Sequence, residues 1–232
     1  MPPRITPLGW GTRLEGRSVW TRNAVRGSSV RGERRKKDGR IEWRKWDAHR
    51  SKVAAAILRT RGDPVELLPK IGSRCLYLGA SSGGTVSHIH DIVCGSGNHH
   101  SGQVVAVEIS PRMVRDLVSV SSERVGLVPV LGDAKIFSQI SPFLSGKVDW
   151  IHQDLSMTDQ AENFVKASEF FLRSGGTGLL SLKAASERAS DGDDSSMFDK
   201  AQDILNSSKL KLIERIDLSG LEEQHVVFYC RI

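Results

Sequence analysis

Five apolar segments of the sequence end in residues that could bind a small polar ligand. The first runs into the glycine-rich stretch "YLGASSGGTVSH" (77–88), and the second ends at Glu108. The third runs into Asp133, the fourth ends at Asp154, and the fifth ends at Lys183. Ligands of open parallel sheets bind at the carboxyl ends of the strands, so these groups are expected to meet at one edge of a sheet.

The order of these residues indicates an adenosine-type ligand. Glycines from Gly79 onward allow close approach of the backbone, and the start of a following helix offers unpaired N–H groups. A carboxylate such as Glu108 can accept from both hydroxyls of a ribose, and Asp133 can accept from the exocyclic amine of an adenine. The spacing G-x-x-x-G-G matches neither the dinucleotide fingerprint nor a phosphate-binding P-loop. An adenosine ligand without a phosphate site points to S-adenosylmethionine.

The segments that carry these residues alternate between strand and helix patterns. The strand segments are "RCLYLGA" (74–80), "QVVAVEIS" (103–110), "VPVLGDA" (128–134), "VDWIHQD" (148–154), "TGLLSLKA" (177–184), "LKLIERIDL" (210–218) and "HVVFYCRI" (225–232). The helix segments are "TVSHIHDIV" (85–93), "SPRMVRDLVSVSSE" (110–123), "DQAENFVKASEFFL" (159–172) and "MFDKAQDILN" (197–206). This alternation predicts an α/β fold with a doubly wound, mostly parallel seven-stranded sheet of the Rossmann-like kind.

The ends of several elements carry more specific signals. Ser110 followed by Pro111 is a good helix start. The last two strands are joined only by "SGLEEQ" (219–224), which predicts an antiparallel hairpin at the end of the sheet. The polar stretch "ASERASDGDDSS" (185–196) is expected to be a mobile loop.

A smaller unit precedes this sheet. Alternating segments around "SVWT" and "IEWRKW", with Asp38-Gly39 where a two-residue turn is expected, predict a small antiparallel β domain over residues 1–46. The second domain then covers residues 47–232 and opens with the helix pattern "WDAHRSKVAAAILRT", for which Asp47 is the expected N-cap.

The basic charge of the chain is concentrated at its N-terminal end. Residues 1–52 hold fifteen Lys and Arg against five Asp and Glu, a balance of +10, whereas the chain as a whole carries +6. Four of the five tryptophans lie in the same part, at positions 10, 20, 43 and 46. Basic residues interleaved with aromatics suit a polyanion such as RNA, but a solvated basic hairpin with a tryptophan core fits equally well.

Composition excludes several other classes. The chain has no apolar run near the length of a membrane span and no apolar signal-peptide core, so we expect an intracellular, cytoplasmic protein. The three cysteines are few and widely spaced, which predicts buried thiols. His99 and His100 have no further ligand nearby, so they are expected to be solvated, and no metal site is predicted.

In combination, several motifs resemble one family closely. The stretches "YLGASSGGTVSH", "VVAVEISPRMVRDL", "PVLGDA", "VDWIHQDLSMTDQAE" and "FFLRSGGTGLLSLKA", preceded by "TRNAVRGSSVRGE" and "WDAHRSKVAAAIL", are similar to fibrillarin. Fibrillarin is the 2′-O-methyltransferase of box C/D ribonucleoproteins, and the resemblance covers nearly the whole chain in order. A Gly/Arg-rich tail is missing, so the chain resembles the short archaeal type.

The resemblance implies a class I methyltransferase fold, S-adenosylmethionine as cofactor, and roles for particular residues. The implied catalytic group is Lys52, Asp154 and Lys183, with His225 beside it. The implied cofactor residues are Gly79, Gly84, Thr85, Glu108, Ile109, Asp133, Ala134, Asp154, Leu155, Ser156, Met157 and Gln160. The family usually has Thr where Gly84 stands and Ala-Gln where Ser156-Met157 stands, so an amide contact to the cofactor is lost at Met157.

The resemblance also implies an assembly. The expected partners are a Nop-type scaffold protein, a box C/D guide RNA, a kink-turn-binding ribosomal-type protein and the target rRNA, with tRNA as a further possible substrate. Two alternatives keep the same fold. One is a stand-alone rRNA 2′-O-methyltransferase, and the other is a non-catalytic RNA-binding or scaffold subunit. A nicotinamide dehydrogenase is disfavoured because G-x-G-x-x-G is absent.

Overall fold

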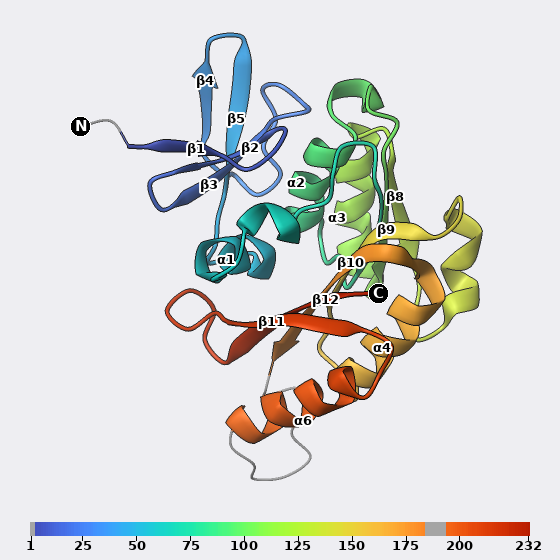
Figure 1. The fold of residues 1–232 in the computed structure, drawn as a ribbon. Helices are drawn as coiled ribbons and strands as arrows, with labels where there is room; N and C mark the ends of the chain where they lie inside the picture. The colour runs from blue at the N-terminus through green and yellow to red at the C-terminus, as the bar shows by residue number, and fades with distance from the viewer. Residues whose placement is uncertain (1–2, 184–193) are drawn as a thin grey trace.

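The fold was obtained as a computed structural model, which describes residues 3–183 and 194–232. Two sheets and the helices around them make up the chain (Figure 1). The five strands of the small N-terminal sheet are β1 (Ile5–Pro7), β2 (Thr12–Glu15), β3 (Ser18–Arg22), β4 (Arg35–Asp38) and β5 (Ile41–Trp46). The seven strands of the large sheet are β6 (Arg74–Leu78), β7 (Gln103–Glu108), β8 (Leu127–Leu131), β9 (Val148–Asp154), β10 (Leu172–Lys183), β11 (Lys211–Asp217) and β12 (His225–Arg231).

Helices fill the connections between the strands. The α-helices of the described residues are α1 (Lys52–Arg59), α2 (Gly84–Val93), α3 (Pro111–Ser122), α4 (Gln160–Phe171) and α6 (Asp194–Asn206). Short 3₁₀ turns lie at Pro64–Leu67, Ser96–Asn98, Phe137–Gln139 and Ser141–Phe143. Within the described part of the chain, no helix is both long and apolar enough to cross a membrane.

The large sheet has the predicted topology. Its order is β11-β12-β10-β9-β6-β7-β8, and the five strands from β10 to β8 are parallel. Strand β12 lies antiparallel between β10 and β11, so the last two strands form the expected hairpin. The order turns back between β6 and β9, which is the place where such sheets bind ligands.

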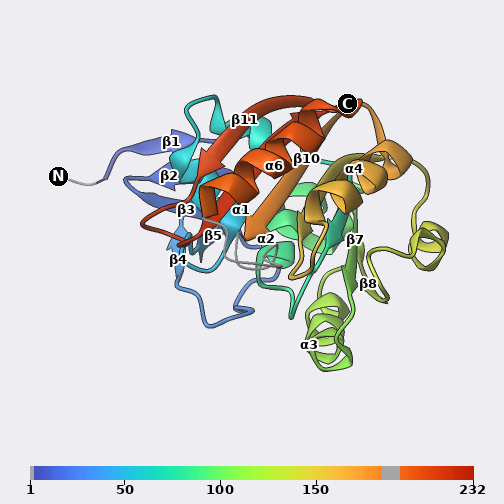
Figure 2. The same ribbon diagram turned by 90° about the horizontal axis from the view of Figure 1, so that it is seen from below.

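Both faces of the large sheet are covered, as its apolar strands require. Cys75 and Tyr77 of β6 pack in one apolar cluster with α1 and α2, whereas Leu76 and Leu78 pack in a second cluster with α4 and α6. Figure 2 shows α4 and α6 side by side along their face of the sheet. The alternation along a single strand is the period-two pattern of a sheet between two helical layers.

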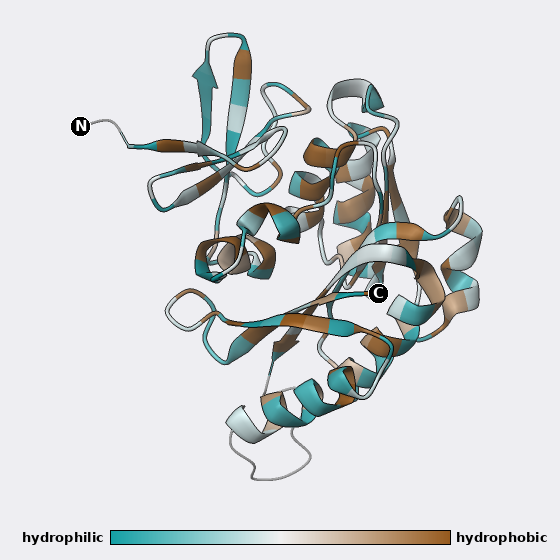
Figure 3. Cartoon of the chain, in the orientation of Figure 1, coloured by the Kyte–Doolittle hydropathy of each residue, from teal (hydrophilic) through white to brown (hydrophobic). Residues whose placement is uncertain are grey.

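The small sheet uses its tryptophans as core. Trp46 is buried among residues of α1 and α2. Lys36 covers the ring of Trp20, and Arg13 covers the ring of Trp43. These three rings are therefore not free to stack on RNA bases, which favours the second interpretation of the basic segment. The edge strand β4 stays hydrophilic along its length (Figure 3), as exposed sheet edges commonly do.

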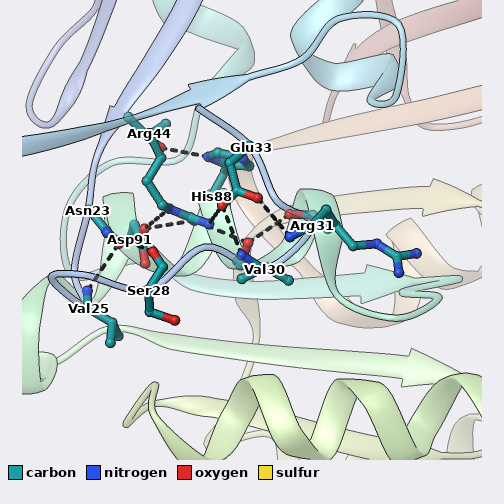
Figure 4. Close-up of polar contacts among 12 residues, drawn as sticks. Asn23, Val25, Ser28, Val30, Arg31, Glu33, Arg44, His88 and Asp91 are labelled. Atoms are coloured by element: carbon teal, nitrogen blue, oxygen red, sulfur yellow. Dashed lines mark hydrogen bonds and ion pairs between the residues drawn. The ribbon is translucent and has the colours of Figure 1, made fainter. Parts of the chain in front are cut away.

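A buried ion cluster joins the small sheet to helix α2 (Figure 4). Arg44 of β5 is fully buried and reaches Asp91 of α2 at 2.8 Å and Glu33 at 2.5 Å. Arg124 approaches the other oxygen of Asp91 at 3.3 Å. Burial alone would raise the pKa of Asp91, but the charge of Arg44, a hydrogen bond with His90 and the charge of Arg124 outweigh it and hold that pKa well below its usual range. The small sheet is thus fixed against α2 by buried ion pairs, because separating them would leave buried charges without partners.

Several local predictions need correction. The N-cap of α1 is Ser51 rather than Asp47, because the residues from Asp47 to Arg50 form a turn before the helix. The turn between β4 and β5 is Gly39-Arg40, one residue later than predicted, since Asp38 pairs with Ile41. The loop predicted over 185–196 lies outside the described residues up to 193, and its last three residues belong to α6.

The cysteines and histidines were largely as expected. Cys75, Cys94 and Cys230 are buried free thiols, and burial raises the pKa of Cys94 and Cys230 to about 12. His99 is exposed, but the His100 ring packs edge-on against Trp10 at 4.1 Å, so His100 is only partly solvated.

Candidate active site at the carboxyl edge of the sheet

The glycine loop after β6 lies close against the end of β9. Gly79 has a φ of +86°, and a Cβ atom there would lie 2.1 Å from the carbonyl oxygen of Asp154. Gly83 has a φ of +87°, and its Cβ would meet Leu117 of α3 at 3.1 Å. Only glycine satisfies both the backbone angle and the space at Gly79. The loop thereby brings the first turn of α2 and the end of β9 to one edge.

Glu108 at the end of β7 is tied to the glycine loop. Its Oε2 accepts from the Ser81 backbone N–H at 2.7 Å, and its Oε1 accepts from the Ser110 N–H at 2.9 Å. Each carboxylate oxygen retains a further lone pair, because an ionised carboxylate has about four acceptor sites. The acid can therefore accept from two ribose hydroxyls while staying held in place.

Asp133 lies beyond the end of β8, next to an exposed apolar surface. Its Oδ1 accepts from the Lys135 backbone N–H at 2.8 Å, and Ala134 beside it is buried. Ile109 is 65% exposed and Leu131 is 56% exposed, although both adjoin the carboxylates of this edge. Exposed apolar side chains can contact the flat face of an adenine, and a neighbouring carboxylate can accept from its amine.

The predicted catalytic group is brought together in part. The Nζ of Lys52, at the start of α1, lies 3.2 Å from Oδ2 of Asp154 at the end of β9, and both side chains are about one quarter exposed, at 23% and 25%. Lys183 extends two residues beyond Ser181, the register partner of Asp154, and makes no ion pair within residues 3–183 and 194–232. His225 pairs with Lys183 in register, and its Nδ1 lies 2.7 Å from the carbonyl oxygen of Glu223.

The segment after β9 lines the same edge. Leu155 packs against Gly79, Ser156 is exposed and Met157 is half-buried. Gln160 begins α4 and is buried, and its carbonyl accepts from the side chain of Gln153 at 2.8 Å. All four residues predicted here therefore follow the strand that carries Asp154.

The hydroxyl of Thr85 is already engaged, which sequence reasoning missed. It donates to the Ser51 hydroxyl at 3.0 Å. Thr85 therefore offers a cofactor its backbone rather than a free hydroxyl. A Cβ built at Gly84 would make only an ordinary contact, 3.6 Å from the side chain of Arg31.

A buried polar layer lies directly beneath the strand ends, and it too was missed. His152 Nε2 is 2.7 Å from the Ser181 hydroxyl, and the rings of Tyr77 and His152 meet edge to face at 4.6 Å. Burial lowers the pKa of His152 to about 4, so its imidazole is neutral at pH 7. Each of these residues precedes a strand-end residue by two positions, so the period of a strand was the available signal.

The opposite edge of the sheet holds a cavity of about 410 Å³ lined partly by Trp150, Lys70 and Thr177. Two of the charged side chains that line it are already in ion pairs, Arg173 with Asp149 and Arg231 with Glu66. The cavity lies at the amino ends of the strands, where parallel sheets rarely place their chemistry. The carboxyl edge is therefore the better candidate for an active site.

A doubly wound seven-stranded sheet with a glycine loop and strand-end acids defines a class I S-adenosylmethionine-dependent methyltransferase. The comparisons with known proteins then give the family. The chain matches the model of the Fibrillarin family over residues 11–232, and it belongs to that family.

Relatives from archaea support the assignment. The fibrillarin-like rRNA/tRNA 2′-O-methyltransferase of Methanocaldococcus jannaschii is 35% identical over 211 residues, which is 90% of this chain and 86% of the relative. That of Aeropyrum pernix is also 35% identical, over 91% of this chain and 86% of the relative.

Solved structures agree with this fold. A Methanococcus jannaschii fibrillarin, a pre-rRNA processing protein, superimposes with a TM-score of 0.86 at 32% identity, covering 100% of this chain and 98% of the other. An Aeropyrum pernix fibrillarin with natively bound S-adenosyl-L-methionine gives 0.83 at 31%, covering 99% of both chains. A fibrillarin/Nop5p complex gives 0.79 at 30%, covering 93% of this chain and 94% of the other.

Proposed function

We propose that this chain is an S-adenosylmethionine-dependent RNA ribose 2′-O-methyltransferase acting within a box C/D guide-RNA complex, on rRNA and possibly tRNA. The observation that carries the proposal is the ion pair of Lys52 and Asp154 beside the glycine loop at the carboxyl edge. Membership of the fibrillarin family supports it.

The residues of this edge fit the cofactor. Glu108 has lone pairs for the ribose, and Asp133 has a free oxygen for the adenine amine beside the exposed Ile109. The N–H groups of Gly84 and Thr85 begin α2, where the helix end favours the carboxylate of the methionine part. Apolar contact is left to Ala134, Leu155 and Met157, with Gly79, Ser156 and Gln160 completing the lining. When bound, the cofactor supplies an electrophilic methyl group on a sulfonium.

The chain's own residues act on the ribose hydroxyl. Methyl transfer is an in-line displacement, so the protein must align the 2′-oxygen and favour loss of its proton. Asp154 orients the hydroxyl by accepting its hydrogen bond. Lys52 and Lys183 stabilise the negative charge that develops on the oxygen, and His225 adjoins Lys183 on the next strand. The neutral His152 beneath adds no competing charge.

The proposed complex assigns recognition of the target sequence to the guide RNA. None of the sites described reads nucleotide bases, so sequence choice is assigned to the guide RNA. A Nop-type scaffold and a kink-turn-binding ribosomal-type protein would hold that RNA. We keep the division into residues 1–46 and 47–232, with exposed basic residues of the first domain free for RNA backbone or scaffold contact. We expect this RNA modification to take place inside the cell, in the cytoplasm.

The proposal is tested by reconstitution. The full chain is combined with a box C/D guide RNA, Nop-type and kink-turn-binding proteins, and a target RNA. Mapping of ribose methylation should find one methyl group at the guided position, and Asp154→Ala should abolish it while the circular dichroism spectrum is unchanged. Methylation by the chain alone would favour the stand-alone enzyme. Failure to bind S-adenosylmethionine at millimolar cofactor in calorimetry would favour the non-catalytic subunit.

A further inference from the structure

Ser51 occupies a buried junction between three parts of the molecule. Ser51 is only 3% exposed, and its hydroxyl accepts from the indole N–H of Trp46 at 2.9 Å. The hydroxyl of Thr85 donates to it at 3.0 Å, and the backbone N–H of Ala54 lies 3.4 Å away as the capped donor of α1. One oxygen thus links the last strand of the small sheet, the first turn of α1 and the glycine loop.

The residue that follows this junction is Lys52. Its ammonium group sits at the end of a four-carbon chain with much rotational freedom, so the direction of the first helical turn decides where that group can reach. Helix α1 has only eight residues, and its start is held by Ser51. Lys52 is thus the first residue after the cap, and its Nζ lies 3.2 Å from Oδ2 of Asp154.

Trp46 extends the link into the small sheet. Its ring is buried and stacks on His88 of α2, with 5.0 Å between ring centroids, and His88 bonds with Thr21 of β3 at 2.6 Å. The indole is therefore fixed by the packing of two strands and a helix, and it presents its N–H to Ser51 in one orientation.

We propose that Ser51, oriented by Trp46, is a positioning residue that holds Lys52 against Asp154, so that the small sheet takes part in methyl transfer. This inference rests on the proposed function of the same site. In this proposal Ser51 acts on the reaction only through Lys52, the first residue of the helix that it caps, and the Thr85 hydroxyl helps to hold Ser51 in place.

The test uses the full chain in the reconstituted guide-RNA complex and measures the single-turnover methylation rate. Ser51→Ala should slow transfer by about 10- to 100-fold, because small misplacements of aligned groups have effects of this size. Ser51→Thr, which keeps the hydroxyl, should restore most of the rate. Trp46→Phe removes the N–H donor together with part of a buried ring, so its unfolding free energy is measured beside the rate. It should slow transfer by a smaller factor, without depending on whether Ser51→Ala folds.

A double-variant comparison separates positioning from general damage. If Ser51 acts through Lys52, the variant Ser51→Ala with Lys52→Ala should be no slower than Lys52→Ala alone. If the rate losses of Ser51→Ala and Lys52→Ala multiply in the double variant, the inference is overturned. An unchanged rate in both Ser51→Ala and Trp46→Phe would also overturn it.

Asp63→Ala is the matched control, since Asp63 also caps a helical turn through its side chain, to the Val65 N–H at 2.9 Å. It should lower stability without lowering the rate; a loss of rate equal to that of Ser51→Ala would overturn the inference. Absence of methyl transfer by the unaltered chain would instead refute the proposed function itself.

Discussion

At the scale of a single residue, Gly79 shows how little space is left at the carboxyl edge of the sheet. Its neighbour across the edge is the backbone of Asp154, which cannot move without moving the end of β9. Gly84 differs, because its φ is ordinary for a helix and its nearest neighbour is the flexible side chain of Arg31. Gly79 lies in the loop after β6, whereas Gly84 is the first residue of α2, and the two carry different constraints.

Gly79→Ala is therefore expected to disrupt the site, and Gly84→Ala to be tolerated. The added Cβ at position 79 would lie 2.1 Å from a carbonyl oxygen at a positive φ, which should cost more than about 2 kcal/mol of unfolding free energy. Denaturant unfolding measures the stability, and calorimetry with S-adenosylmethionine measures binding. Equal effects of the two substitutions would contradict the space argument.

At the scale of elements, β5 and α2 are joined by a charge cluster rather than by apolar contact alone. Arg44 is shared between Asp91 and Glu33, and it also donates to the Ser87 hydroxyl at 3.1 Å. Helix α2 starts at the glycine loop, so this cluster also fixes the helix whose N-terminus faces the proposed cofactor.

Arg44→Ala should lower the unfolding free energy by about 3 to 5 kcal/mol, because it leaves the buried Asp91 with an incomplete set of partners. Denaturant unfolding at neutral pH is the measurement. Arg35→Ala serves as control: its ion pair with Glu42 spans 3.5 Å and its side chain is partly exposed, so it should cost less than about 1 kcal/mol. A similar loss from both would contradict the assigned role of Asp91.

At the scale of the whole molecule, buried neutral histidines set the response to acid. Burial lowers the pKa of His152 to about 4, and burial and the nearby Arg44 hold the pKa of His88 well below its usual range. Between the unfolded value of 6.5 and the folded value the unfolded chain binds more protons, so acid favours unfolding there.

Stability should therefore fall as the pH drops from about 6.5 to about 4, with His152 alone contributing about 3 kcal/mol. Unfolding free energies at closely spaced pH values measure this. His152→Gln should flatten the decline in that window, and a decline of unchanged slope would contradict the assignment. Below pH 4, protonation of Asp91 removes the stability that its ion pairs supply.

The sequence by itself determined the order of strands and helices and the polar residue at each strand end. These features follow from patterns along a few neighbouring residues: period two in strands, a glycine loop, and helix starts such as Ser110-Pro111. The family resemblance supplied the roles of Lys52 and Lys183, which no local pattern distinguishes from solvated lysines.

Only the tertiary structure decided which side chains meet. Ser51 rather than Asp47 caps α1 because the chain turns at residues 47–50, and the indole of Trp46 and the hydroxyl of Thr85 then meet at Ser51. The tryptophans became core, and Asp91 became a buried anion, because packing brought cations from distant segments onto them. Such contacts join residues tens of positions apart, and their free energy depends on burial that only the folded chain creates.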